Sequence, residues 1–332
     1  MLGKRIGIDL GTANSVVWLA GKGIVLNEPT VVAVSMDDMR VVAVGNEAKH
    51  MLGRTPGNIV ASRPMKDGVI ADYAVTEAML KFFIQKAVGN SFLFKPEVMI
   101  CVPAGCTQVE RRAALDATMA AGARVAYLID EPLAAAIGAG IPIAEASGNM
   151  ILDIGGGAAE AAVIALGGVV VHQSVRVGGN KLDEAIIDYA RREKGLVIGD
   201  QTAEAIKIKI GSATKLARKE EMNVKGRDTV TGLPRTFSLT SDEVNLAMQK
   251  PLMQIVGVVK AVLEETPPEL ASDIIDKGIV MSGGTSSLRN LDALLTKEAG
   301  VPAYVAEEPM LCVVKGTGKA IENIDTYRRA LK

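Results

Sequence analysis

The chain has 332 residues, of which 48% are hydrophobic, and a net charge of −1. This length favours two domains, the hydrophobic content excludes a disordered chain, and the balanced charge gives no reason to expect a nucleic-acid partner. No uninterrupted apolar stretch approaches the roughly 20 residues of a membrane span. Three cysteines and two histidines form no metal-ligand pattern. We therefore expect a cytoplasmic protein.

A strand–turn–strand pattern opens the chain. Apolar residues lie at 6–10 and again at 16–19, and such runs beside glycine predict buried strands. The turn between them consists of Gly11, Thr12, Ala13 and Asn14. Asp9 places a carboxylate beside the backbone N–H groups of this turn. Small turn residues let backbone approach a ligand closely, and a neighbouring carboxylate suits a phosphate that carries Mg²⁺.

Strands and helices alternate through the rest of the first half. We predict strands at 24–26, 30–34, 41–44, 97–102 and 125–129, and helices at 76–88, 108–121 and 131–137. The Gly- and Pro-rich residues 53–64 predict a loop. Alternation of this kind is typical of α/β domains with mixed sheets.

The opening pattern then recurs. An apolar run at 151–154 is interrupted by Asp153, and a second apolar run follows at 161–166. The turn between them contains Gly155, Gly156, Gly157 and Ala158. One glycine turn alone is usually an ordinary tight turn. Two copies of the same strand–turn–strand pattern predict duplicated domains that close on one phosphate chain.

The second half continues the alternation. We predict helices at 181–194, 203–212, 241–250, 252–265 and 312–323, and strands at 236–239, 278–281 and 301–305. Residues 215–227 are the most highly charged stretch, which predicts a solvated face or loop.

Two further segments complete a candidate ligand cradle. Glu204 and Lys207 flank Ala205 and Ile206 on a predicted helix, so they share a face that can bracket a ribose and a purine. A surface ion pair is the alternative. After the predicted strand at 278–281, small residues can let a flat base lie on backbone; they are Gly283, Gly284, Thr285, Ser286 and Ser287.

Four segments resemble the MreB family of bacterial actins: residues 9–14, 21–29, 63–70 and 265–270. The resemblance runs from Met1 to about Glu322. It implies the α/β actin-like ATPase fold, with two duplicated RNase H-like domains closing over ATP and Mg²⁺. Each domain would contain a mixed five-stranded sheet and a smaller inserted lobe.

The resemblance also implies the extent of each domain. Domain I would span 1–144, with a small lobe at about 33–70. Domain II would span 145–332, with a small lobe at about 181–244 and an adenosine motif at 282–287. The C-terminal helix would return to domain I.

The resemblance assigns roles to the cradle. Thr12 to Asn14 and Gly156 to Ala158 would contact the phosphates, while Glu204 to Lys207 and Gly284 to Ser287 would hold the nucleoside. Asp9 and Asp153 would serve the metal through water. Glu131 would position the attacking water; the alternative is a carboxylate that only satisfies a helix N-terminus.

The chain departs from the family at two places. Family members usually carry Thr-Thr after the three glycines, where this chain has Ala158 and Ala159. The backbone amides remain but a hydroxyl that positions water is gone, so we expect ATP binding with slow hydrolysis to ADP. Thr285 adds bulk beside the base, which leaves the choice between ATP and GTP open.

The resemblance further implies filaments that pair antiparallel on the inner face of the cytoplasmic membrane. Such filaments would direct rod cell shape together with the cell-wall elongation machinery and its membrane adaptors. The helix at 108–121 would lie at the pairing surface. The loop 91–95 carries Phe92, Leu93 and Phe94, which would insert into lipid; burial under a neighbouring lobe is the alternative.

Other functions of proteins with this fold remain alternatives. Ala158, Ala159 and Thr285 leave room for a divergent paralogue that positions organelles or segregates DNA. A small-molecule kinase or a chaperone ATPase is less favoured, because no acceptor motif and no substrate-binding domain stand out.

Overall fold

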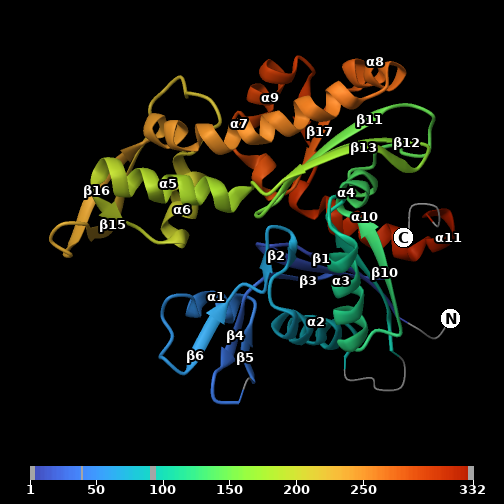
Figure 1. Ribbon diagram of the computed structural model, residues 1–332, viewed down its shortest axis with the longest axis horizontal. Coiled ribbons are helices and arrows are strands. Elements are labelled where there is room, and N and C mark those ends of the chain that lie inside the picture. The colour runs from blue at the N-terminus through green and yellow to red at the C-terminus, as the bar shows by residue number, and fades with distance from the viewer. Residues whose placement is uncertain (1–3, 39, 90–94, 328–332) are drawn as a thin grey trace.

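The computed structural model describes residues 4–38, 40–89 and 95–327. Two five-stranded sheets occupy the middle of the molecule, one above the other in Figure 1. The first has the order β10-β9-β1-β2-β3. Its strands are β1 (Arg5–Leu10), β2 (Asn14–Leu19), β3 (Gly23–Pro29), β9 (Glu97–Val102) and β10 (Val125–Asp130).

The second sheet repeats the topology of the first. Its order is β13-β12-β11-β17-β18, and its strands are β11 (Asn149–Ile154), β12 (Ala159–Ala165), β13 (Gly168–Val175), β17 (Ile279–Ser282) and β18 (Ala303–Val305). In each sheet a central strand pairs antiparallel with the next strand of the chain and parallel with a later one. The repeated sequence pattern therefore marks the same position in two equivalent mixed sheets, as predicted.

Two helices fill the space between the sheets. They are α4 (Glu131–Gly138) and α10 (Cys312–Glu322), and they pack against each other. Their apolar cluster joins Met99 of the first sheet to Ile151 of the second. Because α10 also contacts β1 and β2, the end of the chain returns to the first sheet.

Other helices cover the outer faces of the sheets. α2 (Tyr73–Val88) and α3 (Gln108–Ala120) lie beside the first sheet, and α7 (Ser241–Glu265) packs on β12 and β13 of the second. The remaining helices of this half are α8 (Pro268–Lys277), α9 (Leu291–Ala299) and α11 (Ile324–Tyr327), with short 3-10 turns at Gly284–Ser287 and Pro309–Leu311.

Two smaller sheets extend from the main body (Figure 1). The first joins β4 (Val32–Ser35), β5 (Val41–Val44) and β6 (Ile59–Ser62), with α1 (Asn46–Met51) packed on it. The second joins β14 (Leu196–Val197), β15 (Glu221–Asp228) and β16 (Pro234–Thr240), beside α5 (Gly179–Lys194) and α6 (Asp200–Ile210). A two-stranded ribbon, β7 (Met65–Lys66) with β8 (Val69–Ile70), follows the first lobe. The domain boundary near residue 144 stays a prediction.

Two predictions about local structure were wrong. Pro251 does not separate two helices, because it is buried inside α7. The predicted loop at 53–64 contains β6, which pairs with β4, so strand pairing overrides local composition there. The charged residues 215–227 are mostly exposed, as predicted for a solvated face, but 221–227 form most of β15, in which Val224 is buried.

Helix α7 is the one helix of the described part of the chain that is long and apolar enough, by length and composition, to cross a membrane. Its buried residues include Val244, Leu252 and Val259, and these join the core under the second sheet. The helix is amphipathic and capped by a Thr240–Glu243 box, which is typical of a core helix of a globular protein.

The crossing of α4 and α10 generates a prediction about stability. A Cβ on Gly316 would lie 1.7 Å from the backbone oxygen of Ala134, so Gly316→Ala must push the helices apart. We expect a loss of about 2–3 kcal/mol or more in the free energy of unfolding, measured by urea denaturation. Gly257→Ala is the matched control, because a Cβ on this exposed residue of α7 meets nothing within 4 Å. It should stabilise by up to about 1 kcal/mol; equal stability of the two variants would contradict this account.

Candidate functional site

The first glycine turn joins β1 to β2. Thr30 holds it in place, because its hydroxyl donates to Gly11 O at 2.6 Å and its N–H donates to Ala13 O at 3.0 Å. Thr12 is buried and its Oγ1 accepts the N–H of Gly68 at 2.9 Å. The turn is therefore fixed by Thr30, directly after β3, and by Gly68 in the β7–β8 ribbon.

The second glycine turn joins β11 to β12 and lies against the start of α5. The N–H groups of Gly179 and Asn180 donate to Gly155 O and Gly156 O at 3.0 and 2.8 Å. Thr285 Oγ1 donates to Gly155 O at 2.8 Å. Thr285 therefore ties the segment at 283–287 to the second glycine turn.

The two turns face each other at very short range. A Cβ on Gly156 would lie 2.8 Å from Cβ of Ala13, and a Cβ on Gly157 would lie 2.5 Å from Oγ1 of Thr12. Only glycine permits this approach. The geometry thus brings both turns to the wall of one cavity of about 370 Å³.

Most residues singled out from the sequence line this cavity. They are Asp9, Gly11, Thr12, Ala13, Asn14, Glu131, Asp153, Gly155, Gly156, Gly157, Ala158, Glu204, Lys207, Gly283, Gly284, Thr285 and Ser287. Three others do not line it: Ala205 is exposed, Ile206 is in the core, and Ser286 is buried, with its hydroxyl donating to Gly283 O. Phe92, Leu93 and Phe94 lie outside the described residues.

Asp9 and Asp153 form a pair of carboxyls on the cavity wall. Burial and the charge of Asp153 raise the pKa of Asp9 to about 7, although the Cys101 thiol donates to Oδ1 at 3.5 Å. Burial raises the pKa of Asp153 to about 6, against the hydrogen bond that Ser282 donates at 2.6 Å. The two carboxylates repel, and a divalent cation would relieve this cost.

The donor set fits Mg²⁺ rather than a metal held by the protein alone. Among the described residues no group of three or more His, Cys, Asp or Glu side chains can hold a metal ion. Mg²⁺ usually keeps several waters and binds one or two carboxylates together with substrate phosphates. Asp9 and Asp153 supply that kind of partial, oxygen-only site beside the two glycine turns.

Glu131 opens helix α4 directly before Pro132 and points to the cavity. Its pKa is raised well above the usual range, chiefly by burial and next by the charge of Glu160. Glu160 is 2% exposed and lies opposite Asp153 in the β11–β12 ladder. It accepts the Ala104 N–H at 3.1 Å. Glu131 is thus a cavity-lining carboxyl whose neutral form is favoured by burial and by the charge of Glu160.

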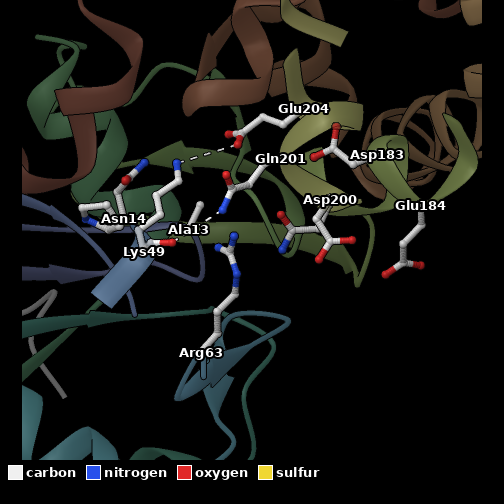
Figure 2. Close-up of a pocket in the computed structure, with 11 residues that line it drawn as sticks. Ala13, Asn14, Lys49, Arg63, Asp183, Glu184, Asp200, Gln201 and Glu204 are labelled. Atoms are coloured by element: carbon white, nitrogen blue, oxygen red, sulfur yellow. Dashed lines mark hydrogen bonds and ion pairs between the residues drawn. The ribbon is translucent and has the colours of Figure 1, made fainter. Parts of the chain in front are cut away.

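The end of the cavity beside α6 contains Lys207 and Glu204, but they do not pair with each other. Lys207 Nζ lies 2.9 Å from Asp183 Oδ2 and donates to Gly179 O at 2.9 Å. Glu204 instead lies 3.7 Å from Lys49, across the adjoining pocket drawn in Figure 2. Both side chains of that second pair are more than one third exposed, so it is weak.

Sequence reasoning missed several residues of the site. Gly68, Asp183, Ile208 and Met310 line the cavity, and Glu160 lies behind it. Of these residues, only Glu160 stands out in the sequence, because it is the one acidic residue in the apolar run of β12. The others reach the cavity through tertiary packing that no local pattern reveals.

The duplicated sheets and the facing glycine turns define a protein of the actin-like class. Comparison with known proteins makes this specific. The family model described as MreB/Mbl protein matches residues 3–329, so the chain belongs to the MreB/Mbl family.

Individual relatives agree with this assignment. The chain is 55% identical to cell shape-determining protein MreB of Escherichia coli K12, covering 98% of this chain and 96% of that protein. It is 50% identical to cell shape-determining protein Mbl of Bacillus cereus over the whole of both chains. Among solved structures, MreB5 of Spiroplasma citri bound to ADP is 35% identical, with a TM-score of 0.93 and 99% of each chain covered. The same protein bound to AMPPNP has a TM-score of 0.92.

Proposed function

We propose that this chain is an actin-like cytoskeletal ATPase that binds ATP and Mg²⁺ between its two glycine turns. The observation that carries the proposal is the contact-range approach of Gly156 and Gly157 to Ala13 and Thr12, beside Asp9 and Asp153. Two turns of backbone N–H groups can take the phosphates while the carboxylates hold a hydrated Mg²⁺. ADP and AMPPNP bound to the Spiroplasma relative support the same ligand here.

The proposed ligand extends from the turns towards α6. Thr12 to Asn14 and Gly156 to Ala158 contact the phosphates. The nucleoside is held by the cavity-lining residues of the other two segments: Glu204, Lys207, Gly284, Thr285 and Ser287. The predicted halves, 1–144 and 145–332, close over it. Ile208 and Met310 line the cavity where the base would lie. Their apolar side chains suit a flat base, which supports this orientation.

Glu131 is the proposed proton acceptor for hydrolysis. It takes a proton from water as the water oxygen attacks the γ-phosphorus, and the bond from that phosphorus to the leaving ADP oxygen breaks. The position of Glu131 on the wall of the same cavity as the two glycine turns supports this role. Ala158 offers no hydroxyl to hold the water, so the proposed rate is low.

Restoring that hydroxyl tests the hydrolysis proposal. We expect Ala158→Thr to raise the rate of phosphate release from ATP by about 10-fold to 10²-fold, because the water is held in line. Ala158→Val is the matched control, since it adds the same bulk without a hydroxyl. Equal rates for Thr, Val and the native chain would contradict the role given to this position.

We further propose that the chain polymerises and directs rod cell shape. The names of its Escherichia coli and Bacillus relatives state a cell shape-determining role for those proteins, which supports the second part of this proposal. Filaments would pair antiparallel and lie on the inner face of the cytoplasmic membrane, with cell-wall elongation proteins and their adaptors as partners. Exposed Val109 and Met119 on α3 support a pairing surface there.

Electron microscopy tests the proposed function most simply. We expect filaments with ATP or AMPPNP and Mg²⁺, and few without nucleotide. Gly157→Val should abolish the nucleotide-dependent filaments, because its side chain would collide with Thr12. Absence of filaments from the native chain under all nucleotide conditions would contradict the proposal and return attention to a kinase of the same fold.

Membrane attachment is assigned to Phe92, Leu93 and Phe94, which are close in sequence to Lys86 and Lys95. Each large apolar side chain can contribute roughly 1.5–3 kcal/mol when buried in lipid, and a filament multiplies weak anchors by avidity. We expect Phe92→Ser/Leu93→Ser/Phe94→Ser to reduce co-sedimentation with anionic vesicles strongly.

The control for this experiment removes exposed apolar side chains elsewhere. Val230 and Leu233 are 91% and 65% exposed at the turn between β15 and β16. Val230→Ser/Leu233→Ser should leave co-sedimentation unchanged. Undiminished pelleting of the triple variant excludes the loop as an anchor.

A further inference from the structure

The cation of the nucleoside end has an unexpected partner. Helical spacing places Lys207 and Glu204 on one face of α6, yet Lys207 contacts Asp183 of α5 at 2.9 Å. Asp183 and Lys207 are both largely buried, with side chains 12% and 14% exposed. Glu204 instead faces Lys49 (Figure 2). Asp183 is therefore the carboxylate that fixes the position of Lys207.

Asp183 lies where a sugar would follow the phosphates. Helix α5 begins at Gly179, whose N–H contacts the second glycine turn. Asp183 is one helical turn further on, about 6 Å along the axis. Asp183 and Ile208 line the same cavity. A nucleotide with phosphates at the turn and its base at Ile208 brings its ribose to Asp183.

The carboxylate of Asp183 can accept more hydrogen bonds than it receives from the protein. Oδ2 accepts from Lys207, whereas the buried Oδ1 has no hydrogen-bond partner among the described residues. Leaving such an atom unpartnered is costly, and an ionised carboxylate offers about four lone-pair sites. A ribose supplies two adjacent hydroxyl donors, which is the chemistry this group lacks.

We propose that Asp183 recognises the sugar: it holds Lys207 through Oδ2 and accepts a ribose hydroxyl with the remaining capacity of its carboxylate. The inference rests on the proposed nucleotide binding and adds a specificity, namely ribonucleotides over deoxyribonucleotides. Glu184 does not share this role, because it leaves α5 in another direction and pairs with Lys181 at the surface (Figure 2).

The test compares the affinity of the native chain for ATP, 2′-deoxy-ATP and 3′-deoxy-ATP, with Mg²⁺, by calorimetry. We expect at least one deoxynucleotide to bind about 10-fold more weakly than ATP, since one hydrogen bond to a charged group is lost. In Asp183→Asn this ratio should fall below about 3-fold. Glu184→Gln is the matched control, because it removes the same charge one residue away, and it should keep the native ratio.

One further variant and the binding of the native chain itself can also overturn this inference. Glu204 also lines the cavity, so Glu204→Gln can weaken the binding of all three nucleotides, but their ratio should stay native. If Glu204→Gln loses the ratio while Asp183→Asn keeps it, the inference is overturned. Equal binding of all three nucleotides by the native chain overturns the inference alone, even if Asp183→Asn fails to fold. Failure of the native chain to bind any nucleotide overturns both this inference and the proposed function.

Discussion

Gly156 and Gly157 lie so close to Ala13 and Thr12 that any side chain on either glycine would push the two turns apart. This steric constraint connects the two halves of the chain. Each turn belongs to a different five-stranded sheet, and each sheet positions its turn through the same strand pairing. The cavity exists because the duplicated elements meet at a pair of residues that carry no bulk.

Electrostatics adds a second constraint at the same place. Asp9, Asp153, Glu131 and Glu160 are acidic groups whose pKa values are all raised, with burial as the largest cause. A folded site of this kind stores repulsion that a bound cation relieves. A ligand that binds only the closed form stabilises that form by mass action. Nucleotide with Mg²⁺ would therefore favour the closed form, because the cation offsets the repulsion among these carboxyls.

The sequence predicted the sheets and the two turns because their signals are local: short apolar runs, glycines and an aspartate at a fixed place. It did not predict β6 or β15, since pairing with a neighbouring strand decides those segments. From helical spacing it placed Glu204 and Lys207 on one ligand-binding face, with a surface ion pair as the alternative. Lys207 instead pairs with Asp183, which comes from another helix, and no spacing rule within α6 reveals this.

A crystal structure of the chain with AMPPNP and Mg²⁺ tests the central claim most directly. The account predicts that the phosphates lie between residues 12–14 and 156–158, with the metal on the side of Asp9 and Asp153. Phosphates bound elsewhere, or against only one of the two turns, would contradict it.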